Sequence, residues 1–300
     1  MPIASAPTDV ALPDGLRAGG RADAWRPTRP GYVALDVDGT LVSREPVPDA
    51  RILDAIVRLG AAGVQVGLAT GRMAAAADAI LATGVLSGPH VFHNGAVVTD
   101  AAGDERIVLG LTDDDVSAIL DFGRGRDDLT IEVYVGRTYL ADRADPRAAP
   151  HAELLRTSPE GHIASVMDLA GRRAVKAVAV CFTAEAAEAT IAAIAGLGLA
   201  AGPAASPATP QLRYVNVTRA GVDKGTGIEA AAGLLGIDLA AVAAIGDETN
   251  DIPMLTRVGT AIAMGESRDP VRAQAHLVAP DFTAGGTVTA LDALTALARG

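Results

Sequence analysis

Residues 32–40 read Tyr-Val-Ala-Leu-Asp-Val-Asp-Gly-Thr. The apolar run Tyr32–Leu35 predicts a short buried strand. Asp36 and Asp38 come at its end, where two carboxylates can converge on one site. There one carboxylate can attack phosphorus while the other transfers a proton. The alternative is an Asp-Gly turn with two solvated carboxylates, and the stretch alone leaves both interpretations open.

Strand and helix signals alternate after this stretch, and such alternation is typical of a parallel α/β sheet. Asp49 is a plausible helix cap. The predicted elements are a helix over Asp49–Leu59, a strand over Val64–Ala69, an Ala-rich helix over Arg72–Leu81, and short strands at Val91–Phe92 and Val97–Val98 around the turn Asn94-Gly95.

The pattern changes between residues 102 and 217, where hairpins and isolated helices predict a separate α+β domain. Strands are expected at Thr130–Val135 and Thr138–Ala141 around a Gly136-Arg137 turn, with helices after Thr112 and over Glu185–Ala195. Regular alternation then resumes with a helix at Thr226–Leu235, a strand at Ala241–Ile245, a helix near Ile252–Leu255, a strand at Thr260–Ala263 and a closing helix from Val288.

The predicted organisation is therefore one core interrupted by an insertion. Residues 1–30, rich in Pro, Ala and Gly, are expected to be a flexible leader. Residues 31–101 and 218–300 are expected to form the two parts of the core domain, and residues 102–217 the inserted α+β domain.

Three further motifs follow predicted strands. Thr70-Gly71 can cap a helix or bind a phosphate at a helix N-terminus. Lys224 lies in the first turn of a predicted helix, where the helix dipole favours acidic residues. A lysine at this position is explained if it binds a dianionic phosphate. Asp247 ends a strand within Gly246–Asp251, a run rich in the oxygen ligands that Mg²⁺ prefers; Asn250 and Asp251 can instead cap the next helix. All four motifs fall at the carboxyl edge of the sheet, where such folds bind ligands.

The four motifs and their order resemble those of the haloacid dehalogenase superfamily, over residues 31–100 and 218–300. The resemblance implies a Rossmann-like core with helices on both faces and a phosphatase that forms an aspartyl-phosphate intermediate. Because the insertion lies between the second and third motifs, the chain looks like the Cof-type sugar phosphatases, with residues 102–217 as an α+β cap.

The resemblance also implies roles for individual residues. Asp36 would be the nucleophile, Asp38 the general acid/base, and Lys224 the group that neutralises phosphate. The metal would be Mg²⁺, held by Asp36, Asp38, Asp247 and Asp251. The phosphate of the substrate would be bound by Thr70, Gly71, Asn94, Gly95 and Asn250. Alternatives are a phosphomutase of the same fold and a non-catalytic protein that binds a phosphorylated ligand.

Composition limits the partners. The net charge of -11 argues against nucleic acid and anionic membranes as partners. The partner that the resemblance implies is a small phosphomonoester substrate. The uncharged stretch Ala189–Leu212 is long enough to cross a membrane, but its prolines favour a helix end, a loop and a strand start. With a single cysteine, Cys181, which is expected to be a buried thiol, the protein is predicted to be soluble and cytoplasmic. The oligomeric state stays open.

Some polar residues carry weaker signals. His90 and His93 have a spacing that metals use, but a structural role is favoured. Glu132 and Tyr134 alternate on one face of a predicted strand, which favours a solvated face over substrate contact. Asn216 precedes the third motif, and its role is open.

Overall fold

The computed structural model describes residues 11–204, 206 and 208–300. The chain forms two compact units. Unit 1, here called the core unit, consists of the chain up to Arg72 together with Ala77–Arg106 and Asp223–Gly300. Unit 2, the inserted unit, consists of Met73–Ala76 and Ile107–Val222. The long segment of the inserted unit therefore begins and ends slightly later than the expected limits of 102 and 217, and four residues from before it, Met73–Ala76, join the same unit.

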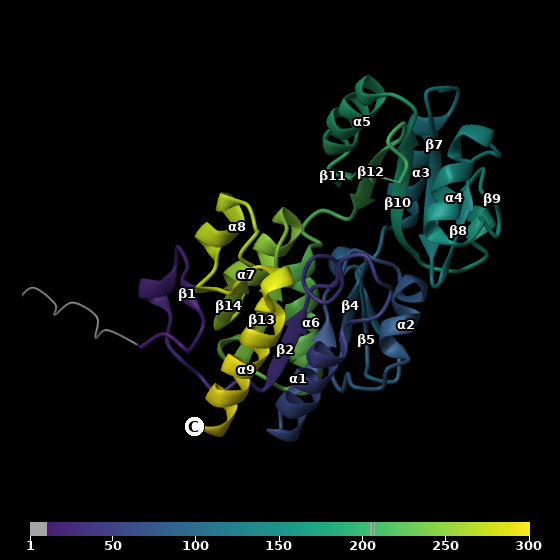
Figure 1. Cartoon of the computed structure of the whole chain (residues 1–300). Coiled ribbons are helices and arrows are strands. Elements are labelled where there is room, and N and C mark those ends of the chain that lie inside the picture. The colour runs from purple at the N-terminus through teal and green to yellow at the C-terminus, as the bar shows by residue number, and fades with distance from the viewer. Residues whose placement is uncertain (1–10, 205, 207) are drawn as a thin grey trace, which may run out of the picture. The chain divides into compact units, whose positions relative to one another are not determined.

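The core unit is built on a six-stranded sheet in the order β1-β15-β14-β13-β2-β3 (Figure 1). Neighbouring strands from β15 to β3 run parallel, and β1 is antiparallel to β15. The strands are β1 Arg17–Ala18, β2 Tyr32–Leu35, β3 Gln65–Leu68, β13 Val242–Gly246, β14 Thr260–Ala263 and β15 Leu277–Val278. The parallel α/β core predicted from the sequence is confirmed.

Helices cover both faces of this sheet (Figure 1). Helix α1 begins after Asp49, whose carboxylate accepts the N–H of Arg51, and it buries Ile52, Ala55, Ile56 and Leu59 on one stripe. The core helices are α1 Ala50–Ala61, α2 Asp78–Leu81, α6 Lys224–Leu235, α7 Ile252–Arg257, α8 Asp269–Gln274 and α9 Gly286–Arg299, with short 3₁₀ turns η1 Ala22–Ala24, η3 His93–Gly95, η6 Leu239–Ala241, η7 Thr249–Asp251 and η8 Phe282–Ala284.

A second, three-stranded sheet extends the core: β4 His90–Phe92, β5 Val97–Thr99 and β6 Glu105–Val108. The predicted turn at Asn94-Gly95 joins β4 to β5, with Asn94 in the left-handed region at φ 55°.

The helix expected over Arg72–Leu81 is wrong in its first half. A 3₁₀ turn, η2 Ala74–Ala77, precedes the short α2, and the hydrogen bond from Arg72 N to Thr70 Oγ1 closes the chain before it into a turn.

The predicted flexible leader is also wrong for the described part of residues 1–30. Residues 17–25 pack against the core: β1 pairs with β15, and the Trp25 side chain is 1% exposed. The Trp25 indole N–H donates to Thr260 Oγ1 at 3.1 Å. A buried aromatic ring with a satisfied polar atom anchors this segment. Residues 1–10 lie outside the described part of the chain.

The inserted unit contains a sheet in the order β11-β12-β10-β7-β8-β9, antiparallel except for β8 and β9. Helices α3 and α5 cover one face through an apolar cluster that includes Ile131, Ala177 and the predicted buried thiol Cys181. The elements are α3 Asp113–Gly123, β7 Leu129–Val135, β8 Thr138–Ala141, η4 Pro146–Ala148, α4 Ala149–Leu155, β9 Gly161–His162, η5 Val166–Leu169, β10 Ala174–Cys181, α5 Ala184–Gly196, β11 Ala200–Ala204 and β12 Arg213–Thr218. Among the described residues, no helix is both long and apolar enough to span a bilayer.

Candidate active site

Asp36 and Lys224 form a buried ion pair at the carboxyl edge of the core sheet. Asp36 continues β2, because its N–H donates to Ile245 O at 3.0 Å. The Lys224 ammonium donates to Asp36 Oδ1 at 2.6 Å, and the two side chains are 1% and 7% exposed. Lys224 reaches this position from the first turn of α6, which Asp223 caps by accepting the N–H of Thr226 at 2.8 Å.

Asp251 is the second partner of Lys224. Its Oδ1 lies 2.5 Å from Lys224 Nζ, and its Oδ2 accepts the N–H groups of Asp247 and Glu248 at 2.9 and 3.0 Å. Gly246 allows this approach, since a Cβ there would lie 2.6 Å from Asp251 Oδ2. Asp251 therefore holds the loop after β13 as well as the lysine, and its side chain does not cap α7.

Asp247 connects the loops that follow β2 and β13. Its Oδ1 accepts the hydroxyl of Thr40 at 3.2 Å. Gly39 has φ 81°, in the region that favours glycine, and a Cβ there would lie 2.2 Å from Asp247 Oδ2. Thr40 and Gly39 are thus required for this contact, a role that the sequence pattern did not reveal.

Asp36, Asp247 and Asp251 offer carboxylate oxygens that lie within 4.8 Å of one another. Burial raises the pKa of Asp36 well above its ordinary value, and Asp251 adds to this increase while Lys224 opposes it. Burial, followed by the charge of Asp251, raises the pKa of Asp247 to about 7. Burial acts to lower the pKa of Lys224, but Asp251 and Asp36 outweigh it and raise the pKa.

These directions have one physical origin: three acidic groups lie close together, and a single buried ammonium pairs with two of them, Asp36 and Asp251. A divalent cation among the carboxylates would supply the missing positive charge and favour their ionised forms. Hard oxygen donors of this kind suit Mg²⁺. The residues present therefore fit the predicted metal in both charge and donor type.

Asp38 lies beside this cluster in sequence but points to a different partner. Its carboxylate accepts two hydrogen bonds from Arg72, from Nε at 2.9 Å and from Nη2 at 2.5 Å. The Asp38 side chain is 63% exposed and that of Arg72 27%. Arg72 stood in the second sequence motif without an assigned role.

The residues expected to bind phosphate also come together, although their backbone differs from the prediction. Thr70 follows β3, and its hydroxyl accepts the N–H of Arg72 at 3.1 Å, so it closes a turn and caps no helix. Its carbonyl accepts the N–H of Asn94 at 3.0 Å. The Asn250 amide donates to Asn94 Oδ1 at 3.1 Å.

Glycines bring these segments close to one another. A Cβ on Gly71 would lie 2.9 Å from Asn94 Oδ1, and one on Gly95 would lie 2.0 Å from the carbonyl of Asp223. The turn after β4 is thereby fixed against the segment that leads into α6 and Lys224. The structure thus gathers the core residues named from the sequence at one edge of the sheet.

The polar residues singled out in the inserted unit are buried there. The expected solvated face for Glu132 and Tyr134 is wrong: they are 3% and 2% exposed, and the Tyr134 hydroxyl donates to Glu132 Oε2 at 3.0 Å. His151 Nδ1 lies 3.1 Å from the other oxygen of Glu132. Helical residues of α4 cover this face, and an alternating pattern does not distinguish a covered polar face from a solvated one.

Asn216 has a defined partner in the inserted unit. Its Oδ1 accepts a hydrogen bond from Lys176 Nζ at 3.0 Å. Burial lowers the pKa of Lys176 to about 8, opposed by the charge of Glu132. In the core unit, His90 has a structural role as expected, since its Nδ1 accepts the N–H of Leu68 at 3.3 Å.

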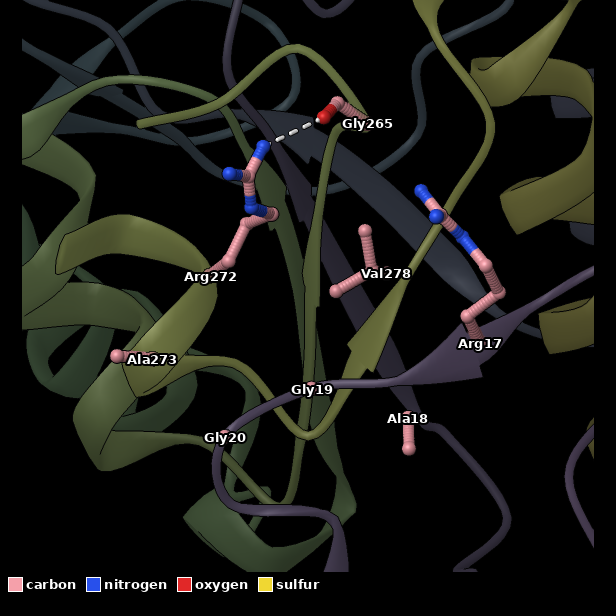
Figure 2. Close-up of a pocket in the computed structure, with 8 residues that line it drawn as sticks. All are labelled: Arg17, Ala18, Gly19, Gly20, Gly265, Arg272, Ala273 and Val278. Carbon is pink, nitrogen blue, oxygen red and sulfur yellow. Dashed lines mark hydrogen bonds between the residues drawn. The ribbon is translucent and has the colours of Figure 1, made fainter. Parts of the chain in front are cut away.

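A pocket of about 530 Å³ in the core unit lies away from the predicted residues (Figure 2). Figure 2 shows Arg272 reaching toward Gly265 on one side of Val278 and Arg17 on the other. Arg272 already donates to Gly265 O at 2.9 Å and pairs with Asp269. The N–H groups of Gly19 and Gly20 are bound to the carbonyls of His276 and Arg272. The donors that could bind an anion there are largely occupied within the protein.

A model of the haloacid dehalogenase-like hydrolase family matches residues 33–291, a range that includes every core site residue named above. The chain belongs to this family. The HMP-PP phosphatase of Yersinia pestis (strain Pestoides F) is 28% identical over 238 residues, which cover 78% of this chain and 83% of that protein. A 5-amino-6-(5-phospho-D-ribitylamino)uracil phosphatase of Bacillus subtilis (strain 168) is 26% identical over 288 residues, 87% of this chain and 97% of that one.

Other similarities are more local or concern the fold. The phosphoglycolate phosphatase of Natronomonas pharaonis is 40% identical, but over 77 residues that make up 34% of its length. The solved structure of a phosphatase of the haloalkanoate superfamily from Bacteroides thetaiotaomicron has a TM-score of 0.72 at 23% identity and covers 88% of this chain and 95% of that one. The predicted family, its fold and its phosphatase class are confirmed for this haloacid dehalogenase-like enzyme.

Proposed function

We propose that the protein is a Mg²⁺-dependent phosphomonoester hydrolase that acts on small phosphorylated metabolites. Sugar phosphates are the substrates that we expect it to prefer. The observation that carries this proposal is a cluster of carboxylate oxygens from Asp36, Asp247 and Asp251 within 4.8 Å of one another, two of which, Asp36 and Asp251, pair with the buried ammonium of Lys224. A nucleophilic carboxylate, a set of metal-ligating oxygens and a fixed cation are the parts that phosphoryl transfer through an aspartyl phosphate needs.

In the first step, a carboxylate oxygen of Asp36 bonds to phosphorus, and the bond from phosphorus to the ester oxygen breaks. Asp38 gives its proton to that oxygen, so the alcohol leaves neutral. In the second step, water attacks phosphorus, Asp38 takes a proton from this water, and Asp36 is released with inorganic phosphate. Protons and charge therefore balance over one turnover.

Other residues of the core unit hold the reacting groups. Lys224 lies 2.6 Å from Asp36, where its charge can orient the nucleophile and offset the transferred phosphoryl oxygens. Thr70, Gly71, Asn94, Gly95 and Asn250 are proposed to bind the phosphate. Asp36, Asp247, Asp251 and the main chain of Asp38 would hold Mg²⁺, which when bound supplies positive charge to the nucleophile and the phosphate.

The substrate class rests on the inserted unit and on the relatives. Residues that contact only the phosphate cannot distinguish one leaving group from another, so discrimination would come from polar side chains of the inserted unit acting as a cap. The names of the two relatives above, both phosphatases of small phosphorylated molecules, support this class. The cytoplasmic location stays a prediction.

The test is hydrolysis of p-nitrophenyl phosphate by protein freed of metal with a chelator. We expect no activity without a divalent ion and recovery on adding Mg²⁺, while Asp247→Asn should need much more Mg²⁺ to recover. Full activity of the metal-free protein would contradict the proposal. Turnover without added bisphosphate also separates a hydrolase from a phosphomutase.

A further inference from the structure

We propose that Arg72 is the positioning residue of the general acid/base: it holds the carboxylate of Asp38 in the orientation from which Asp38 exchanges protons with the leaving group and water. This inference rests on the proposed function and adds one residue to it. The two hydrogen bonds from Arg72, at 2.9 and 2.5 Å, reach different oxygens of Asp38 and so fix the plane of the carboxylate.

Asp38 needs such a partner because, within the described part of the chain, its side chain has no hydrogen bond to a residue other than Arg72. The loop backbone is closed by hydrogen bonds from Gly39 N to Val42 O and from Leu41 N to Val37 O, at 2.8 and 2.9 Å. The Asp38 side chain projects from this closed loop and is 63% exposed. An exposed aspartate samples several rotamers, and a bidentate guanidinium selects one of them.

Arg72 is itself held on both sides of its backbone. Its N–H donates to Thr70 Oγ1 at 3.1 Å, and its carbonyl accepts the N–H of His93 at 3.0 Å. Thr70 is anchored in turn, because its N–H donates to Val91 O at 2.8 Å. The end of β3 and the turn after β4 therefore fix the backbone of Arg72. The two hydrogen bonds from its guanidinium then fix the orientation of the Asp38 carboxylate.

The test is a double-mutant cycle with two substrates, a hexose 6-phosphate and p-nitrophenyl phosphate. Arg72→Ala should lower kcat on the sugar phosphate on the order of 10- to 100-fold, because an alkoxide needs a well-placed proton donor. It should lower kcat on the aryl ester by less than about threefold, since p-nitrophenolate leaves without protonation. In an Asp38→Ala background, Arg72→Ala should cause no further loss on either substrate.

Arg72→Lys keeps the positive charge but cannot make the two parallel hydrogen bonds of a guanidinium. Its kcat on the sugar phosphate should therefore lie between those of Arg72→Ala and wild type. The matched control is Arg58→Ala, which removes another exposed arginine–aspartate pair, with Asp292, that includes none of the proposed site residues; it should behave as wild type. Equal losses on both substrates, a rise in KM alone, or an undiminished loss in the Asp38→Ala background would overturn the proposal.

A crystal structure of Arg72→Ala separates this inference from the proposed function. The Asp38 carboxylate should leave its wild-type orientation or lose its density, whereas an unchanged Asp38 would overturn the positioning role. If the wild type hydrolysed neither ester, the proposed function would be wrong, and with it a role in proton transfer.

Discussion

Lys224 donates to Asp36 at 2.6 Å across 188 residues of sequence, in a place where neither side chain is more than 7% exposed. The same ammonium binds Asp251 at 2.5 Å, so one cation holds two buried acids. Removing one member of a buried ion pair costs more than removing the pair, because the remaining charge stays desolvated.

Replacing Lys224 by Met should therefore abolish activity and also destabilise the protein by about 3–5 kcal/mol. Urea denaturation in the presence of chelator measures the free energy of unfolding without a metal contribution. Asp36→Asn should be less destabilising, since Lys224 keeps Asp251. If Lys224→Met unfolded like wild type, the buried pair would have no structural importance.

A second prediction concerns the nucleophile. Asp36→Asn should remove hydrolysis, because an amide oxygen is a poor nucleophile toward phosphorus, while the circular dichroism spectrum stays that of wild type. Hydrolysis of an isotopically chiral thiophosphate ester in ¹⁷O-water should retain the configuration at phosphorus, because two successive displacements occur there. Net inversion at phosphorus would point to direct attack by water.

Acid should destabilise the core through two buried histidines. His90 and His276 accept backbone N–H groups of Leu68 and Ala261 through Nδ1, at 3.3 and 3.0 Å. Burial lowers the pKa of each to about 4; Asp100 opposes this for His90, and Arg21 adds to it for His276. Between about pH 6.5 and 4 the unfolded chain binds protons that the folded protein does not, so stability falls as pH falls.

The loss should reach about 3 kcal/mol per histidine once pH is below 4. Urea denaturation at several pH values between 7.5 and 5 measures the part of this loss that falls above pH 5. Replacing both histidines by Gln should flatten this dependence, and His162→Gln, at an exposed position, is the control. An unchanged slope in the double variant would assign the acid sensitivity to other groups.

Trp25 should report on the segment before β2. As the single tryptophan, 1% exposed, it should emit at short wavelength in the folded protein and shift to long wavelength together with global unfolding. Trp25→Ala should cost about 3–5 kcal/mol of stability, and Trp25→Phe, which keeps most of the ring, should cost less. Emission typical of an exposed indole in the native protein would contradict the packing described above.

Exchange of the inserted unit tests substrate choice. A chimera in which the matching segment of another family member replaces residues 107–222 should acquire that member's preferred phosphomonoester. It should keep the proposed Mg²⁺ requirement, because the proposed phosphate-binding residues of the core unit stay the same. An unchanged preference would place the specificity in the core unit.

The sequence predicted the bounds of an element best where all residues of that element are buried. Tyr32–Leu35 and Thr260–Ala263 are strands with the predicted bounds, because all their residues are buried and the apolar run is continuous. β1 and β15 were missed: each has two residues, and their pairing joins Arg17 to Val278. Local periodicity carries no information about such a distant partner.

The same limit applied at the site. The four motifs could be found because their residue types and order are unusual. The partners of Thr40 and Arg72 could not, since both depend on loops that only the fold brings together. Glu132 and Tyr134 were placed on a water-facing surface because alternation alone does not say whether α4 covers it.

Strand order also has a consequence for how the chain is made. β2, which carries Asp36, lies between β3 and β13, and its second neighbour is synthesised only after the whole of residues 107–222. The sheet of the inserted unit lies entirely within residues 129–218, so it can form while the ribosome is still extending the chain. One edge of β2, the strand that precedes the proposed nucleophile, stays unpaired until Gly246 has been translated. The hydrogen bond between Trp25 and Thr260 can form only after Thr260 has also been translated.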